Sequence, residues 1–390
     1  MTHTIHWLGA GLSSAPGIIE LAKKAIPEAT PIIVWNRSLA KAKQALENDD
    51  VEIDIRQLDW DALTQSVKQG DVLVSMLPAT MHLTVAQFCL SHQAHFVSSS
   101  YISPEMQALN SQAQASGLCF VNEVGLDPGI DHLLAHLLVD SYQSSAQFSP
   151  ENQHYFRSYC GGFPKVANDF KYKFSWSPLG VLKALRSKAK WQDDGVIKTS
   201  NAPWEALSLY QAQLSGHNET FQAYPNRDSL PFLKQYNFQD NWDVQQFVRG
   251  TLRLNGWSTA WQSLFDEIAT LEGSDGEERL QEISQELEQK YSYEEHEADR
   301  VVMCVELEIR KEDQVVWHQS YHLDSQGNEQ GQAMARLVSL PVGLAIESVL
   351  NHQIPAGVSA APDKPEHINQ WLSALTAFGE SICHHNHLLK

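Results

Sequence analysis

The sequence predicts an α/β protein in which a doubly wound parallel sheet precedes a mixed α/β domain with a small helical insertion. Two patterns support this prediction. Six short apolar runs alternate with helical patterns up to residue 121, as in parallel sheets whose strands are joined by helices. From about Tyr155 the runs become longer and alternate in polarity, which predicts a mixed or antiparallel second sheet.

The elements of the first third of the chain are expected in a regular order. The predicted strands are 5–8, 31–35, 51–55, 71–76, 95–98 and 118–121. The first predicted helix between them ends at about residue 25. The other predicted helices span 39–47, 60–68, 81–91 and 104–116. The run from Asp71 to Met76 is almost unbroken in its apolar character, which is typical of a strand buried on both faces.

The glycine-rich turn after the first strand predicts a phosphate site. Gly9 permits a tight turn, and Gly11 lets the backbone approach a pyrophosphate at the N-terminus of the next helix. Ser14 stands where the third glycine of such a motif would be, so the support comes from the surrounding strand–helix context. We expect a Rossmann-type dinucleotide-binding domain whose first turn contributes Gly9, Gly11, Leu12, Ser13 and Ser14.

The end of the second strand favours NADP over NAD. An NAD enzyme usually places a carboxylate there for the ribose hydroxyl, whereas this chain has Asn36, Arg37 and Ser38. Arg37 could pair with a 2′-phosphate, and its neighbours could donate hydrogen bonds. The alternative is that Arg37 is a solvated residue in a turn.

Small and hydroxyl-bearing residues end the fourth and fifth strands, where the cofactor would lie. Those expected to contact the cofactor are Leu77, Pro78, Ser99 and Ser100. Such residues also form helix N-caps, and Ser103 before Pro104 is a good candidate for that role.

Composition limits the possible partners and compartments. The chain has 390 residues and a net charge of −19, which predicts two or three domains and argues against binding nucleic acid. Its five cysteines form no CxxC pair, which predicts reduced thiols in the cytoplasm and no zinc site or other metal site. We identify neither a signal peptide nor an apolar stretch long enough for a membrane span. A small-molecule substrate and a possible homodimer are expected.

The later part of the chain is expected to contain a further sheet and several helices. Predicted strands are 156–159, 170–176, 250–254, 301–309 and 315–323, the last two as an antiparallel hairpin. An acidic helical stretch spans 277–300, with a flexible loop at 273–277 before it. Helices are expected at 333–350, where Pro341 should break the helix, and at 368–377.

Six ordered segments give the chain a resemblance to the saccharopine dehydrogenase family. They are Asn122 to His132, Ser158 to Pro164 with its Cys-Gly-Gly turn, Tyr172 to Leu182, Tyr224 to Ser229, Arg249 to Arg253, and Met334 to Pro341. The resemblance spans nearly the whole chain. It implies a Rossmann domain at 1–125, a substrate domain at 126–240 and 300–345, a helical insertion at 241–299, and C-terminal helices at 346–390 that return to the Rossmann domain.

The resemblance also implies an NADP-linked reaction of an amino-acid adduct. Saccharopine would be interconverted with L-glutamate and 2-aminoadipate 6-semialdehyde, by hydride transfer to or from an imine. One alternative is a carboxylated polyamine dehydrogenase of the same superfamily, whose substrate would need acidic side chains where saccharopine needs arginines. Another is a homologue that binds the cofactor without catalysis.

Asp127 is the main catalytic candidate. It follows the sixth strand and Leu126, close to where the nicotinamide is expected, and both residues are expected to contact the cofactor. Its carboxylate could bind the secondary amine of the substrate or hold a water for imine hydrolysis. The alternative is that Asp127 caps a helix that has Pro128 at its first position. Asp131 and His132 are expected to be structural.

The other candidates are assigned to substrate binding, and Tyr101 and Cys160 are also candidates for the catalytic site. Arg227 could clamp a carboxylate or pair with Asp228, and Arg249 with Thr251 could hold a second carboxylate or lie on an edge strand. Tyr101 and Cys160 match positions that the family places near the substrate. A tyrosine there could relay a proton or simply pack, and the cysteine is expected to line the pocket.

Overall fold

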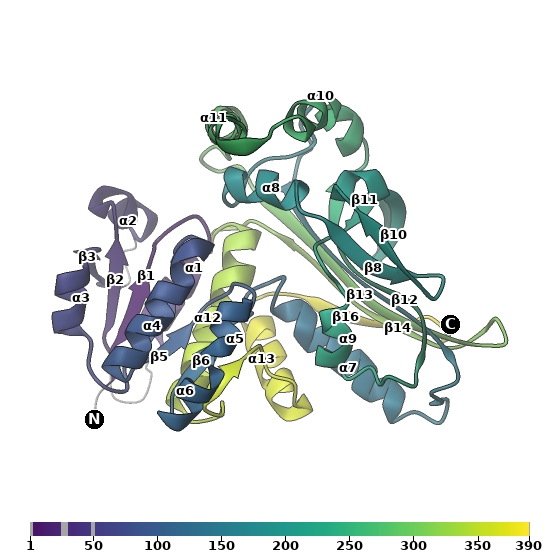
Figure 1. The fold of residues 1–390 in the computed structure, drawn as a ribbon, viewed down its shortest axis with the longest axis horizontal. Helices are drawn as coiled ribbons and strands as arrows, with labels where there is room; N and C mark the ends of the chain where they lie inside the picture. The colour runs from purple at the N-terminus through teal and green to yellow at the C-terminus, as the bar shows by residue number, and fades with distance from the viewer. Residues whose placement is uncertain (1–2, 25–29, 48–50, 390) are drawn as a thin grey trace. The chain divides into compact units, whose positions relative to one another are not determined.

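A computed structural model describes residues 3–24, 30–47 and 51–389 (Figure 1). The chain divides into two compact units. The first unit contains Met1–Leu133 and Met334–Asp363, and the second contains Leu134–Ala333 and Lys364–Lys390. Each unit has its own sheet.

The first unit is built on a parallel sheet of seven strands in its described residues. The strand order is β15-β6-β5-β4-β1-β2-β3, and the first six strands in chain order have the arrangement 3-2-1-4-5-6 of dinucleotide-binding domains. The strands are β1 (Ile5–Leu8), β2 (Ile32–Asn36), β3 (Asp54–Gln57), β4 (Val72–Ser75), β5 (His95–Val97), β6 (Cys119–Val121) and β15 (Gly357–Ser359). The predicted doubly wound parallel sheet is therefore confirmed, with one further strand supplied from far along the chain.

Helices cover both faces of this sheet, as its unbroken apolar strands require. One face packs on α3 (Trp60–Ser66), α4 (His82–His92), α5 (Pro104–Ala108) and α6 (Asn110–Ala115) through a shared apolar cluster. The remaining helices of the unit are α1 (Ala15–Lys23), α2 (Leu39–Ala45) and α12 (Ala333–Leu350), with a short turn η1 (Ala79–Met81). The predicted end of the first helix, at residue 25, lies outside the described residues.

Helices α1 and α12 approach each other closely at Gly17. A Cβ on Gly17 would lie 2.4 Å from the carbonyl oxygen of Ser339, and the Gly17 N–H donates to Ser339 Oγ at 2.8 Å. The third glycine of a dinucleotide-binding motif normally permits close helix packing of this kind. Here Gly17, one helical turn after Ser14, permits the close contact.

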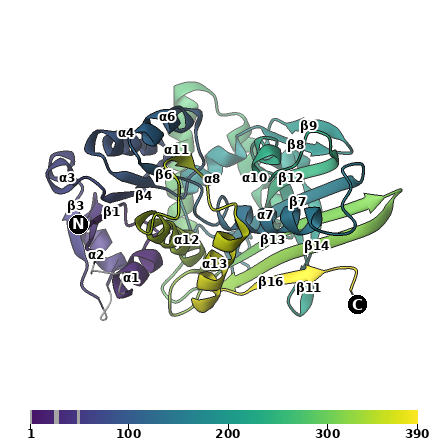
Figure 2. The same ribbon diagram turned by 90° about the horizontal axis from the view of Figure 1, so that it is seen from below.

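The second unit is built on a mixed sheet of nine strands within its described residues. The main path is β10-β11-β12-β7-β13-β14-β16, with β8 and β9 attached to β12, and only the β12–β7 pair is parallel. The strands are β7 (Gln153–Pro164), β8 (Ala189–Asp193), β9 (Val196–Ser200), β10 (Ser208–Leu214), β11 (His217–Pro225), β12 (Asp243–Leu254), β13 (Asp299–Lys311), β14 (Gln314–Gln326) and β16 (Ile382–Asn386). Figure 2 shows the long β13–β14 hairpin with β16 beside it, and the predicted hairpin is confirmed.

The second unit also contains six helices and one short turn among its described residues. They are α7 (Ile130–Gln143), α8 (Pro178–Leu185), α9 (Pro231–Gln235), α10 (Trp257–Ala269), α11 (Gly273–Tyr291) and α13 (Pro365–Ala377), with the turn η2 (Pro203–Ala206). Residues of α8, α10 and α11 share an aromatic cluster with Tyr172, Phe174 and Tyr224. On the other face of the sheet, Tyr159, Phe163, Phe221 and Leu252 belong to a second cluster.

Four local predictions were wrong. The helical stretch predicted at 277–300 ends at Tyr291, and strand β13 begins at Asp299. Residues 170–176 form no strand, because Tyr172 and Phe174 are buried against Trp261 of α10. Among the described residues, the segment makes one isolated β-bridge, from Phe174 to Ser292. Residues 273–277 begin helix α11 instead of forming a loop. Pro341 lies inside α12, which continues without a break because its apolar side chains are packed on both sides of the proline.

The unit boundaries also differ from the expected domains. Within the expected helical insertion, β12 is a central strand and only α10 and α11 are helical. From the expected C-terminal return, β15 joins the first unit, whereas α13 and β16 belong to the second. A strand needs only a free edge with unpaired N–H and C=O groups, and that feature is not visible in composition.

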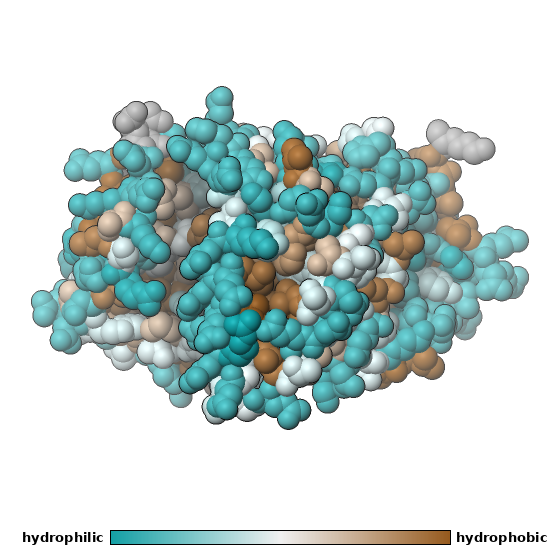
Figure 3. Space-filling model, turned by 90° about the horizontal axis from the view of Figure 1, so that it is seen from above, coloured by the Kyte–Doolittle hydropathy of each residue, from teal (hydrophilic) through white to brown (hydrophobic). Residues whose placement is uncertain are grey.

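Helix α12 is both long and apolar. It is long and apolar enough to cross a membrane, but 78% of its most apolar stretch is buried within the fold. Such burial is what a core helix shows. The face of the molecule drawn in Figure 3 is covered mainly by hydrophilic side chains, with small apolar areas between them.

Candidate functional site

The turn after β1 has the geometry of a phosphate-binding loop. Gly9 has a φ of +97°, and a Cβ there would lie 2.8 Å from the carbonyl oxygen of Met76. At Gly11 a Cβ would meet no atom within 4 Å, so the described fold itself does not require glycine there. The turn leads directly into α1, in whose first turn Pro16 has no N–H and Gly17 donates its N–H to Ser339 Oγ. These features fit a dinucleotide whose phosphates approach the backbone at Gly11.

Asn36 connects the two turns that the cofactor is expected to contact. Its Oδ1 accepts the Ala10 N–H at 3.2 Å, and its Nδ2 donates to the Ser38 carbonyl at 2.8 Å. Ser38 caps α2 by accepting the Lys41 N–H. Asn36 and Ser38 therefore hold the loop, whereas the exposed guanidinium of Arg37 makes no hydrogen bond or ion pair with any residue that the structure describes.

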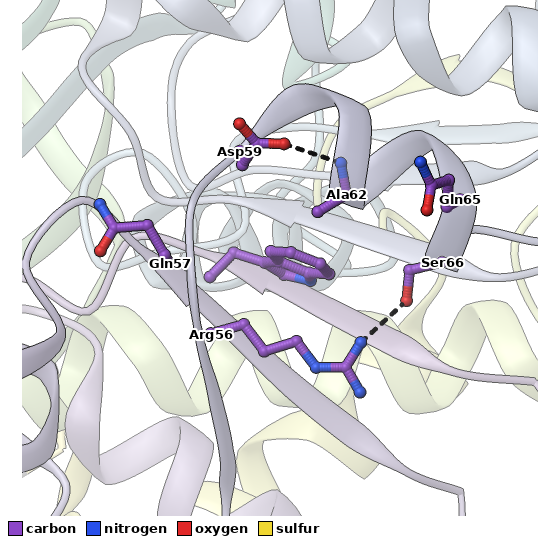
Figure 4. A pocket seen from close by; sticks show the side chains of 7 residues that line it. Arg56, Gln57, Asp59, Ala62, Gln65 and Ser66 are labelled. Atoms are coloured by element: carbon purple, nitrogen blue, oxygen red, sulfur yellow. Dashed lines mark hydrogen bonds between the residues drawn. The ribbon is translucent and has the colours of Figure 1, made fainter.

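A cavity of about 490 Å³ lies beside the Arg37 turn. Figure 4 shows it lined by Trp35, Arg56, Gln57, Asp59, Ala62, Gln65 and Ser66. The Arg56 guanidinium lies 5.5 Å from the centre of the Trp35 ring and donates to Ser66 and Asp54. None of the predicted cofactor residues lines this cavity, although Gln57 donates to the Arg37 carbonyl at 2.7 Å. We therefore do not assign it to the reaction.

The end of β5 carries a hydrogen-bonded chain that the sequence did not suggest. His82 lies between two serines, with Nδ1 2.8 Å from Ser75 Oγ and Nε2 2.8 Å from Ser100 Oγ. Burial lowers the pKa of His82 from 6.5 to about 4, so the imidazole is neutral near pH 7. His82 thus fixes the side chain of Ser100, a predicted cofactor residue. As one of 17 histidines, it carried no signal in the sequence.

Asp127 lies at the tip of a tight turn after β6. The Gly125 N–H donates to the Pro128 carbonyl at 2.9 Å, and the Ile130 N–H donates to the Gly125 carbonyl at 3.0 Å. From Val121 to His136, Asp127 is the one residue that is not buried. Tyr101, in the segment after β5, donates its hydroxyl to Asp127 Oδ1 at 3.1 Å. The structure therefore brings together the two predicted catalytic groups of the first unit.

The helix after Asp127 begins later than the sequence predicted. Helix α7 begins at Ile130, so Pro128 is not its first residue, and the residue before the helix is Gly129. The Gly129 N–H donates to Asp131 Oδ1 at 2.7 Å. Asp131 thus satisfies an N–H group next to the helix start.

Three buried ionisable residues hold the base of this turn. Glu123 Oε1 accepts the Ile102 N–H at 3.0 Å, and Glu123 Oε2 lies 3.1 Å from His132 Nε2. His132 Nδ1 lies 3.6 Å from Asp131 Oδ2. Glu123, which has a φ of +55°, links the end of β5 to the start of α7. The row Glu123–His132–Asp131 therefore fixes the segment that presents Asp127.

Three predicted residues of the second unit, Cys160, Arg249 and Thr251, lie on one face of its sheet, which we call the arginine face. Thr251 on β12 is in register with Cys160 on β7, and Arg249 is in register with Ser158. Because side chains alternate along a strand, these four lie on the same face. Arg249 is buried, with its guanidinium 3.8 Å from the centre of the Phe232 ring, so the interpretation as an edge-strand surface residue was wrong.

Two other predictions in this region concern the Cys-Gly-Gly segment and Arg227. Cys160 and the following glycines lie inside β7, so the expected Cys-Gly-Gly turn is an extended strand. A Cβ on Gly161 would lie 2.4 Å from the Leu252 carbonyl oxygen, which explains a glycine there without a turn. Arg227 is exposed in the loop after β11 with a φ of +53°, and Asp228 lies 3.9 Å from Lys190 Nζ.

Comparison with known proteins identifies the family. The saccharopine dehydrogenase NADP binding domain matches residues 5–121, and the saccharopine dehydrogenase C-terminal domain matches residues 125–379. The chain belongs to the saccharopine dehydrogenase family. Its first unit therefore contains an NADP-binding domain, as the Arg37 turn predicted.

Individual relatives agree with this family. The chain is 33% identical over 272 residues to saccharopine dehydrogenase (NADP(+), L-glutamate-forming) of Pyricularia oryzae, which covers 68% of the chain and 57% of the relative. It is 34% identical over 263 residues to the Saccharomyces cerevisiae enzyme of that name, which covers 66% and 56%. The chain thus matches little more than half the length of these relatives. A solved apo saccharopine dehydrogenase (L-Glu forming) from S. cerevisiae has a TM-score of 0.79 at 26% identity, with 98% and 99% covered.

If Arg37 pairs with the 2′-phosphate as the sequence predicts, replacing it with Ala should raise the KM for NADPH about 10- to 100-fold, because that hydrogen-bonded charge pair is lost. The KM for NADH should change little. Lys43→Ala, which removes another exposed cation of the same region, should leave both values unchanged. Steady-state kinetics with each cofactor measures this, and an equal loss with both cofactors would contradict the assignment of Arg37.

Proposed function

We propose that this protein is an NADP-dependent oxidoreductase of lysine metabolism that interconverts saccharopine with L-glutamate and 2-aminoadipate 6-semialdehyde. In the oxidative direction, saccharopine, NADP⁺ and water give glutamate, the semialdehyde, NADPH and a proton. The nicotinamide, when bound, accepts or donates the hydride. The observation that carries the proposal is Asp127, hydrogen-bonded to Tyr101 and reaching out of an otherwise buried segment.

Asp127 and Tyr101 supply the acid–base groups that the reaction needs. The substrate has a secondary amine that is cationic when protonated, and a carboxylate beside it stabilises that charge and the charge of the imine formed from it. The same carboxylate can accept a proton from the water that hydrolyses the imine. The Tyr101 hydroxyl donates to Asp127 Oδ1, which orients the carboxylate.

The arginine face supports a substrate rich in carboxylates. Saccharopine carries three carboxylates, and arginine binds a carboxylate through two parallel hydrogen bonds. Arg249 is held by its stacking on Phe232, and its backbone N–H donates to Ser229 Oγ at 3.0 Å, so its position is fixed before substrate binds. Arg227, in the loop after β11, is exposed and offers a second guanidinium. A diamine substrate would gain nothing from these cations.

The assay that tests the function measures NADP⁺ reduction with saccharopine, and NADPH oxidation with the semialdehyde plus either glutamate or a diamine. Turnover with glutamate supports the proposal. Turnover with the diamine alone would replace it with a carboxylated polyamine dehydrogenase, and turnover with neither would reject both activities.

Arg227→Ala should raise the KM for saccharopine about 10- to 100-fold, while the Kd for NADPH stays the same, because a charge-assisted contact to a carboxylate is lost. Arg227 is exposed, so the fold should tolerate the change. Lys311→Ala, an exposed cation at the far end of β13, is the matched control and should have no effect. A parallel loss of NADPH binding would show that Arg227 is structural.

A further inference from the structure

The hydrogen-bonded chain from Ser75 through His82 to Ser100 joins three segments of the first unit. Ser75 is the last residue of β4, His82 is the first residue of α4, and Ser100 lies in the segment after β5. Ser75 and His82 are buried, whereas Ser100 is partly exposed. One end of the chain is therefore enclosed in the fold, and the other end can reach a bound molecule.

The two nitrogens of His82 have opposite roles in this chain. A neutral imidazole has one nitrogen that donates a hydrogen bond and one that accepts. His82 is neutral near pH 7, because burial lowers its pKa from 6.5 to about 4. Nδ1 lies 2.8 Å from Ser75 Oγ, and Nε2 lies 2.8 Å from Ser100 Oγ. The surroundings of the two serines decide which nitrogen carries the hydrogen.

The Ser75 hydroxyl requires Nδ1 as an acceptor. Among the residues that the structure describes, His82 Nδ1 is the one hydrogen-bond partner of Ser75 Oγ. If Nδ1 carried the hydrogen, the hydroxyl hydrogen of Ser75 would be buried without an acceptor, which is costly. Ser75 therefore donates to Nδ1, and the imidazole hydrogen is on Nε2.

This arrangement determines the role of the Ser100 hydroxyl. The Nε2–H group of His82 donates to Ser100 Oγ, so the hydroxyl hydrogen of Ser100 points away from His82. Within the described part of the chain, Ser100 Oγ has no other hydrogen-bond partner. Ser100 is therefore a hydrogen-bond donor whose hydrogen is available to a bound molecule.

The place of Ser100 in the sheet indicates which molecule it contacts. The phosphate-binding turn follows β1, and Arg37, the predicted 2′-phosphate residue, follows β2. The adenosine half of the cofactor therefore belongs to the β1–β3 half of the sheet. The strands β4, β5 and β6 form the other half, where the second nucleotide of a dinucleotide lies at the carboxyl ends of the strands. Ser100 follows β5 and so belongs to the nicotinamide half.

We propose that His82, with its tautomer set by Ser75, is a positioning residue that holds Ser100 as a hydrogen-bond donor to an oxygen of the nicotinamide nucleotide. The ribose and the carboxamide of that nucleotide both offer acceptor oxygens. Because the hydroxyl is oriented before the cofactor binds, less conformational freedom is lost on binding. The proposal uses the NADP binding of this family and does not depend on the saccharopine reaction.

The test compares the binding of NADPH with that of 2′,5′-ADP, which has the adenosine half and the 2′-phosphate but no nicotinamide. Isothermal titration of the full-length protein gives both Kd values. Ser100→Ala and His82→Leu should each raise the Kd for NADPH about 3- to 10-fold, the loss expected for one hydrogen bond. The Kd for 2′,5′-ADP should stay the same, which also shows that each variant is folded.

Further variants separate positioning from a general structural role. Because His82 acts through the Ser100 hydroxyl, adding His82→Leu to Ser100→Ala should raise the Kd for NADPH no further. His82→Gln keeps an N–H group that can donate to Ser100 and should restore part of the affinity. Ser75→Ala keeps both partners but removes the hydroxyl that sets the tautomer, so it should weaken NADPH binding less than Ser100→Ala. This variant tests the proposal even if His82→Leu does not fold.

His95→Leu is the matched control. Burial also lowers the pKa of His95 to about 4, but His95 lies at the start of β5, away from the carboxyl ends of the strands. Its Nδ1 accepts the Cys119 N–H at 3.0 Å, so its loss should lower the Tm and leave both Kd values unchanged.

Three results would overturn the proposal. The first is an unchanged Kd for NADPH in Ser100→Ala or His82→Leu, which includes the case in which the KM for the substrate rises instead and Ser100 donates to the substrate. The second is an equal loss of 2′,5′-ADP binding in folded variants. The third is a double variant in which the losses of the two single variants add, because His82 would then act independently of Ser100.

Discussion

Replacing Asp127 with Asn should lower kcat for saccharopine oxidation about 100-fold or more, with little change in the Kd for NADPH. General acid–base groups contribute roughly 10²- to 10⁴-fold to rates, and Asn can neither accept a proton nor balance the charge of a protonated amine. The substitution preserves size and can still accept the Tyr101 hydrogen bond that Asp127 Oδ1 accepts at 3.1 Å. The fold should therefore be retained, and the loss should be in turnover.

Two comparisons make this result interpretable. Tyr101→Phe removes the hydrogen bond to Asp127 but keeps the carboxylate, so its effect on kcat should be smaller. Asp140→Asn, at an exposed position of α7, should leave kcat unchanged. If Asp127→Asn raises KM alone and leaves kcat intact, the carboxylate only binds the substrate and performs no acid–base step.

The doubly wound sheet could be predicted because its signals are local. Buried parallel strands such as Val72–Ser75 are continuous apolar runs, and each predicted strand from β1 to β6 was found within a few residues of its expected position. Strand β15 could not be found in the same way, since Gly357–Ser359 is three residues long and joins the sheet by pairing with β6, over 200 positions earlier. Such a pairing depends on an edge formed by distant residues.

Prediction of the candidate site from the sequence was limited for the same reason. The Gly9 turn and Asp127 could be identified from their place after apolar runs. The sequence could not show that Tyr101 donates to Asp127, or that His82 fixes Ser100, because these contacts join separate segments of the chain. The edge-strand alternative for Arg249 was also wrong, because Arg249 lies in a central strand of the second sheet. A side chain's role depends on its neighbours across the sheet, and the pairing register of a strand cannot be predicted from the sequence of that strand alone.

Gly129→Ala is expected to have the largest effect on stability among the single-methyl changes near the site. A Cβ on Gly129 would lie 2.0 Å from the oxygen, and 2.5 Å from the carbon, of the Gly125 carbonyl, and its φ of +148° disfavours any L side chain. Both atoms belong to the backbone, so the overlap can be relieved only by opening the turn. We expect the free energy of unfolding to fall by about 2–5 kcal/mol, which chemical denaturation would measure.

Gly117→Ala separates the two causes of that loss. Gly117 also has a positive φ, +70°, but a Cβ there would meet no atom within 4 Å, so only the backbone strain of about 1–2 kcal/mol applies. Gly129→Ala should exceed this value and should also lower kcat, because the hydrogen bonds from Gly125 to Pro128 and from Ile130 to Gly125 form the turn that presents Asp127. If both variants lose the same stability, the contact between Gly125 and Gly129 does not hold the turn. If Gly129→Ala is destabilised but keeps its kcat, the position of Asp127 does not depend on the turn, and its role in turnover would have to rest on Tyr101 alone.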